Sequence, residues 1–114
     1  SEESSALTPG ANKQLMKIQK LIKENISHDD DWQKFAQNFD VVYENYLKRL
    51  VQLYPQLNAN DQRLCAYLKM GLSSKEIAPL LNMSYRSVEM NRYRLRKKME
   101  LSRDVNLVEY LQRI

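Results

Sequence analysis

Residues 84–99 are SYRSVEMNRYRLRKKM, and they decide the fold because they predict a helix with one apolar face and one basic face. Ser84 suits the N-cap, because its hydroxyl can accept from the amides of the first turn. At about 100° per residue, Val88, Leu95 and Met99 fall near one line, which predicts a stripe facing a core. The opposite side carries a second set of residues, Arg86, Met90, Tyr93 and Lys97, flanked by Glu89 and Arg94.

The predicted helix is strongly basic. Residues 86–98 contain six Lys and Arg residues and one acid. Like charges one turn apart repel each other, and such crowding persists most easily where a polyanion neutralises it. The charge therefore favours a nucleic-acid contact, and a solvated basic surface is the alternative interpretation.

A shorter predicted helix precedes the basic one. Ser73 and Glu76 have the spacing of a capping box at its start, and Pro79 is expected to bend this helix or end it early. Its apolar face comprises Ile77, Leu80 and Leu81. Residues 82–84 then form a tight turn. A helix, a short turn and a basic helix form a helix-turn-helix, in which the second helix contacts base edges in the major groove.

Residues 57–101, LNANDQRLCAYLKMGLSSKEIAPLLNMSYRSVEMNRYRLRKKMEL, resemble the LuxR-type (GerE-like) helix-turn-helix domain. The matching positions, at the spacing of the family signature, are Gly71-Leu72-Ser73, Lys75-Glu76-Ile77-Ala78, Leu81, Ser84, Val88 and Lys98-Met99. The resemblance implies a compact four-helix domain of transcriptional regulators, with the third helix in the major groove and the fourth often used for dimerisation. The runs KEIAPLL and VExxRYRLRKK are most similar to the C-terminal output domains of Bacteroidetes sensor-regulators.

Three positions differ from the family pattern. Glu89 stands where the family usually has a basic residue, and it can accept from the N4 amine of cytosine. Asn91 stands where His is frequent. Arg92 replaces a commonly apolar residue, so it either extends sideways to a phosphate or pairs with an acid.

These observations predict two sets of DNA contacts. The expected base-reading residues are Arg86, Glu89, Met90 and Tyr93, with Asn91 added from the family position alone. The expected phosphate contacts are the amides and hydroxyls of Ser73 and Ser74, together with Lys75, Arg92, Arg94 and Lys97. Contact between Arg86 and guanine is the main specific contact expected.

The composition predicts an all-α protein. The chain has 114 residues with only two Gly and three Pro, which leaves little material for β-turns. Residues 1–58 carry seven basic and eight acidic residues, whereas residues 59–114 carry eleven and six, so the positive charge belongs to the second half. We expect a flexible lead-in over residues 1–10, a helical extension over residues 11–55 and the DNA-binding domain over residues 56–114.

The extension contains two predicted helices, over residues 11–26 and 31–54. The second has apolar and aromatic side chains, all large except Ala36, at alternating spacings of four and three, which is a heptad pattern. This seam comprises Trp32, Ala36, Phe39, Tyr43, Tyr46, Leu50 and Leu53, flanked by Phe35, Val42 and Leu47. Two interpretations stay open: the seam packs within its own chain, or it also forms a homodimer contact.

The remaining segments complete the domain. Asn58 and Asp61 are expected to cap a helix over residues 59–70, and Cys65 of that helix is expected to lie in the core of the domain. Residues 107–114 are expected to form a last amphipathic helix. A single Cys permits no internal disulfide, so a reducing, cytoplasmic setting is expected. The chain does not begin with Met, which suggests a piece of a larger sensor or regulator. We expect this piece to make no membrane contact, whereas a membrane anchor in the parent protein stays open.

We expect no catalytic residues, no cofactor and no metal. The sequence shows no Gly-rich phosphate loop and no Cys/His cluster, and His28 with Asp29, Asp30 and Asp31 favours helix capping over metal binding. Double-stranded DNA is the expected partner, and we expect the protein to bind it as a homodimer. The alternatives are a promoter-binding domain like region 4 of sigma factors, and a helical protein-interaction module that uses the seam over residues 32–53.

Overall fold

The computed structural model describes residues 9–23 and 29–114, and these residues contain seven helices and no strand. The predicted all-α class is confirmed. The predicted lead-in lies outside the described residues except for Pro9 and Gly10, and so does His28, a candidate metal ligand. No group of three potential metal ligands occurs within the described ranges. None of the described helices is both long and apolar enough to cross a membrane.

The chain divides into two compact units, residues 1–48 and residues 49–114. The predicted boundary lay at residue 55, seven residues later. Helix α4 (Tyr46–Leu53) spans the observed boundary, and the residues that follow Lys48 bond within the second unit. Arg49 donates to the carbonyl of Ile114, and the hydroxyls of Tyr54 and Tyr110 share a hydrogen bond. These long-range contacts assign the second half of α4 to the second unit.

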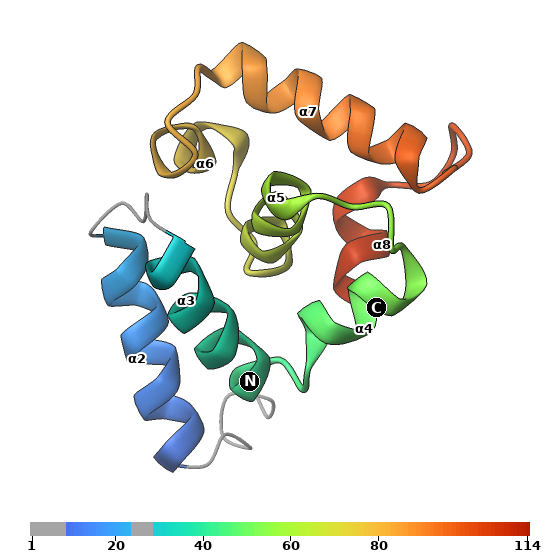
Figure 1. Ribbon diagram of the computed structural model, residues 1–114. Helices are drawn as coiled ribbons and strands as arrows, with labels where there is room; N and C mark the ends of the chain where they lie inside the picture. The colour runs from blue at the N-terminus through green and yellow to red at the C-terminus, as the bar shows by residue number, and fades with distance from the viewer. Residues whose placement is uncertain (1–8, 24–28) are drawn as a thin grey trace. The chain divides into compact units, whose positions relative to one another are not determined.

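The first unit contains α2 (Pro9–Lys23) and α3 (Asp29–Val42), which lie side by side (Figure 1). Helix α2 begins two residues before the predicted start, and its predicted end at Ile26 lies outside the described residues. The single helix predicted over residues 31–54 is wrong, because α3 ends at Val42 and α4 begins at Tyr46.

Asp40 accounts for the break between α3 and α4. Glu44 and Asn45 adopt left-handed backbone angles, with φ of 55° and 61°, and the Asn45 amide donates to the Asp40 carbonyl at 2.8 Å. The Asp40 carboxylate, only 8% exposed, then accepts from the Leu47 amide at 2.8 Å. It thereby satisfies an amide in the first turn of α4, which would otherwise lack an acceptor. Asp40 therefore stabilises the end of α3 through its backbone carbonyl and the start of α4 through its carboxylate.

The heptad seam does not continue through this break. Phe35, predicted only to flank the seam, is fully buried, whereas Leu53 of the seam is 60% exposed. Neighbouring rings contact one another along α3 and just beyond its end. Trp32–Phe35 and Phe35–Phe39 stack at centroid distances of 5.2 Å and 5.7 Å, and Phe39–Tyr43 are tilted at 4.4 Å. Tyr46 and Leu50 are also buried within the single chain. The arrangement favours the interpretation that the seam packs within its own chain.

The second unit contains the helices of the predicted helix-turn-helix domain. These are α5 (Ala59–Lys69), α6 (Ser74–Leu80), α7 (Tyr85–Lys98) and α8 (Leu107–Arg113). Helix α5 contacts α7 and α8, and α6 packs against α7 (Figure 1). The fully buried side chains include Leu64, Tyr67, Leu68, Ile77, Val88, Leu95 and Leu111. Cys65 is buried as predicted, and desolvation raises the pKa of its thiol, which keeps it in the unreactive protonated form.

Three of these helices end in the same way. Gly71, Asn82 and Glu100 follow α5, α6 and α7 with φ of 89°, 58° and 54°. The next amide in each case bonds back to a carbonyl in the last turn, as Leu72 does to Tyr67 at 3.1 Å. Helix α6 ends one residue after Pro79, in agreement with the predicted early end.

Replacing Gly71 by Ala is expected to lower the free energy of unfolding by about 1 kcal/mol, because a Cβ is unfavourable in the left-handed region. A Cβ at this position would meet no atom within 4 Å, so backbone strain alone is tested. Glu100→Gly is the matched change in the opposite direction, and it is expected to stabilise the protein. Urea unfolding of both variants provides the measurement, and destabilisation by Glu100→Gly would contradict the argument.

Candidate nucleic-acid interface

A tight turn joins α6 to α7. Asn82 is left-handed, and the Met83 amide donates to the Ala78 carbonyl at 2.9 Å. Ser84 then caps α7, because its Oγ accepts from the Ser87 amide at 3.1 Å. The predicted turn and N-cap are thus present, and they set the direction in which α7 leaves α6.

Helix α7 has the two faces that its sequence predicts. Val88 and Leu95 are fully buried, and Met99 after the helix is nearly so. The other face exposes Arg86, Glu89, Met90, Tyr93, Arg94 and Lys97. Met90 is 47% and Tyr93 53% exposed. The Lys97 Nζ lies 4.7 Å from the centroid of the Tyr93 ring, a cation–π contact that holds the ring beside a positive charge.

The basic residues of α7 do not all face outward. Arg96 donates to the carbonyls of Val105 at 2.5 Å and Ser102 at 2.8 Å, which supports the turn before α8. Lys98 and Arg92 also bond within the unit. The prediction of one continuous basic face is therefore wrong in part, since Arg86, Arg94 and Lys97 are the exposed members of the six. Sequence charge alone does not distinguish these two groups.

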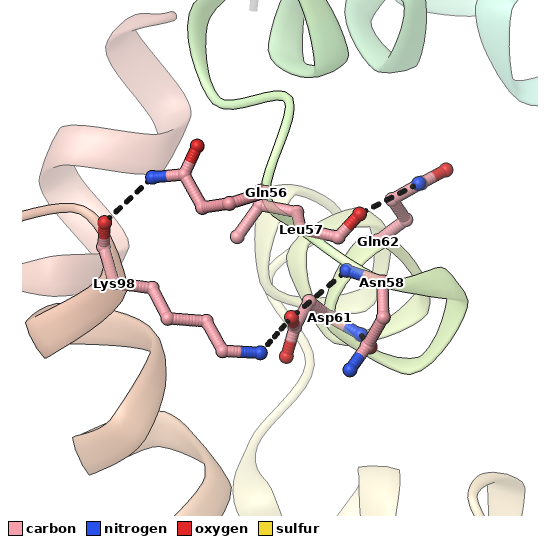
Figure 2. Close-up of polar contacts among 6 residues, drawn as sticks. All are labelled: Gln56, Leu57, Asn58, Asp61, Gln62 and Lys98. Carbon is pink, nitrogen blue, oxygen red and sulfur yellow. Dashed lines mark hydrogen bonds and ion pairs between the residues drawn. The ribbon is translucent and has the colours of Figure 1, made fainter.

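Lys98 connects α7 to the start of α5 (Figure 2). Its Nζ lies 2.5 Å from Oδ2 of Asp61. Asp61 and Asn58 form the predicted capping box, with the Asp61 amide donating to Asn58 Oδ1 at 2.8 Å and the Asn58 amide donating to Asp61 Oδ2 at 3.0 Å. The side-chain Nε2 of Gln56 donates to the Lys98 backbone carbonyl at 2.9 Å (Figure 2). Together these contacts hold the last turn of α7 against α5.

Ser74, Glu89 and Arg92 form a second connection, between α6 and α7. The Ser74 side chain is only 5% exposed, and its hydroxyl donates to Oε2 of Glu89. Arg92 Nη1 lies 2.9 Å from Ser74 Oγ and 3.8 Å from Glu89 Oε2. Of the two alternatives for Arg92, pairing with an acid is therefore the one observed.

Other predicted contact residues also have partners within the unit. The Ser73 amide donates to Glu76 Oε1 at 2.9 Å, and Ser73 Oγ accepts from the Glu76 amide at 3.2 Å. The bonds from Ser73 lower the pKa of Glu76. The side-chain amide of Asn91 donates to Met83 Sδ at 3.1 Å. Ser73 and Asn91 therefore contribute to the local structure, whereas Lys75 is exposed at the start of α6.

A hollow lies on each side of α7. The larger, about 470 Å³, includes Arg92, Tyr93 and Arg96 together with Arg103 from the loop before α8. The smaller, about 140 Å³, includes Arg94 and Lys98 together with Asn58 and Asn60 at the start of α5. Sequence reasoning missed Arg103 and Asn60, because each lies outside the helix that carries the motif and only folding brings it beside α7.

Residues 59–111 match the family of bacterial regulatory proteins, luxR family. The matched segment begins at the first residue of α5 and ends within α8, so it includes α5, α6, α7 and most of α8. It covers just under half of the chain. Neither the curated proteins nor the solved structures include a match to this chain. The match confirms the resemblance to a GerE-like helix-turn-helix domain, the DNA-binding domain of transcription regulators.

Proposed function

We propose that this chain is the DNA-binding output module of a transcriptional regulator. The premise is the luxR-family domain at residues 59–111, and we place α7 of that domain in the major groove of DNA. The observation that carries the proposal is the exposed face of α7. Its opposite face is buried by Val88 and Leu95, so the helix presents one fixed surface. That surface carries three cations and two large apolar side chains, which suit phosphates and base edges respectively.

The base-reading residues we propose are Arg86, Met90 and Tyr93. Arg86 is exposed in the first turn of α7, where recognition helices contact base edges, and its fork of donors suits guanine. Met90 and Tyr93 offer apolar contact to thymine methyl groups. Asn91, predicted from the family position, donates to Met83 instead, and we assign it to the turn between α6 and α7.

Phosphate contacts are proposed on both sides of α7. Arg94 and Lys97 are exposed on the helix, and Lys75 is exposed at the start of α6. Arg103, which lines the larger hollow, adds a cation beyond the end of the helix. Because the groove is bounded by two phosphate strands, cations on either side of a helix within it meet opposite strands.

The proposal is tested by fluorescence anisotropy of a labelled duplex at several salt concentrations. The logarithm of the binding constant is expected to fall linearly with log salt, and Lys97→Ala is expected to reduce this slope by about 1 while weakening all sequences alike. Lys48→Ala, an exposed lysine in the first unit, is the control and is expected to leave the slope unchanged. Absence of binding by the unaltered protein at low salt would refute the proposed function.

Two further parts of the proposal concern assembly. The resemblance to Bacteroidetes output domains supports a parent chain with a sensor part, to which this module responds. A continuous heptad seam no longer supports the homodimer predicted from the sequence, because α3, which carries the first part of the seam, ends at Val42. The same titration, repeated at stoichiometric concentrations, measures the number of chains bound per duplex. One chain per duplex would indicate a monomer on DNA, and two would indicate a dimer.

A further inference from the structure

Glu89 lies on the exposed face of α7, yet its carboxylate is directed to α6. The side chain is 46% exposed, but Oε2 accepts from the hydroxyl of Ser74, the first residue of α6. The same oxygen lies 3.8 Å from Arg92 Nη1, which in turn bonds to Ser74 at 2.9 Å. One carboxylate oxygen, one hydroxyl and one guanidinium thus form a closed triangle across the two helices.

The surroundings favour this arrangement over an outward rotation of Glu89. Ser74 is almost completely buried, so water would not readily replace the carboxylate as the acceptor of its hydroxyl. A buried donor left without an acceptor is costly. Arg92 would also lose its neighbouring acid, on a helix that already carries like charges one turn apart. Contact between Oε2 of Glu89 and a cytosine would therefore require breaking an existing set of bonds.

We propose that Glu89 is a positioning residue that links α6 to α7 through Ser74 and Arg92, and that it does not select a base. The inference rests on the proposed function for its effect on DNA. The triangle fixes the rotation of α7 relative to α6, and it thereby determines how Arg86, Met90 and Tyr93 face the groove. It also directs Arg92 inward, so this cation is not a phosphate contact.

The first test does not need DNA. Ser74→Ala, Glu89→Gln and the double variant are unfolded with urea, and each single change is expected to raise the unfolding equilibrium constant about two- to tenfold. The double variant is expected to raise the unfolding equilibrium constant by less than the product of the two single effects, because Ser74→Ala removes the donor and Glu89→Gln removes the charge of the same interaction. Glu89→Gln combined with Ser102→Ala, an exposed serine before α8, is the additive control. Additivity for Ser74 and Glu89 would overturn the proposed link.

The second test measures base preference by selecting bound duplexes from a random pool. Ser74→Ala and Glu89→Gln are expected to lower affinity for all sequences by a similar factor while the preferred base at every position stays the same. Loss of a cytosine preference in Glu89→Gln, with the preference intact in Ser74→Ala, would overturn the proposal and restore Glu89 as a base-reading residue. Failure of the unaltered protein to bind DNA would refute the proposed function instead, and the unfolding test would still decide the link.

Discussion

Replacing Leu95 by Ala is expected to lower the free energy of unfolding of the second unit by about 2–5 kcal/mol, the range for emptying a fully buried leucine site. Leu95 has no exposed surface, and it lies on the face of α7 that packs in the unit. Small domains are stable by only about 5–15 kcal/mol. This single change is therefore expected to remove a large fraction of the stability of the second unit.

Met90→Ala is the matched control for Leu95→Ala. It removes a side chain of similar size from the same helix, but at a position that is 47% exposed. We expect a change within about 0.5 kcal/mol, as for most surface substitutions. Urea unfolding followed by circular dichroism measures both variants. An equal decrease in the free energy of unfolding for Leu95→Ala and Met90→Ala would mean that α7 is not oriented as described.

Replacing Arg86 by Ala is expected to reduce the discrimination between the preferred site and a random duplex by about 1–3 kcal/mol. The reason is the bidentate contact that an exposed arginine in the first turn of α7 can make with guanine. Competition titrations with both duplexes at one salt concentration measure this difference. The preferred duplex comes from the selection experiment described above.

Arg113→Ala is the control for Arg86→Ala, because it removes an exposed arginine from α8. It is expected to leave discrimination unchanged. Equal weakening of both duplexes by Arg86→Ala would assign Arg86 to a phosphate and would remove it from the base-reading set. The Arg86→Ala variant is expected to be as stable as the unaltered protein, so a folding defect would not account for the result.

Several elements could be predicted because their determinants lie within one helical turn. The capping boxes of Asn58 with Asp61 and Ser73 with Glu76 were visible as residue spacings. The N-cap at Ser84 and the buried line through Val88 and Leu95 followed from the same local periodicity. The family match at residues 59–111 agrees with the predicted domain.

Other features depend on partners that are distant along the chain. The heptad spacing predicted one helix, but the Asp40 carboxylate bonds to Leu47, seven residues away, across a pair of left-handed residues. The six basic residues in α7 predicted one positive face. Lys98, however, pairs with Asp61 of α5, which lies 37 residues earlier in the chain. Neither pairing leaves a signal in the local pattern.

The sequence by itself determined the class of the protein, the start of each capped helix and which side of α7 is apolar, because neighbouring residues decide these by periodicity and by hydrogen bonds within a turn. Only the tertiary structure decided which charges of α7 remain available. Arg92, Arg96 and Lys98 have partners in α6, the α7–α8 loop and α5. Whether a charged side chain faces solvent or pairs within the protein depends on the groups that folding brings within a few ångströms of it. For α7 those groups come from other parts of the chain.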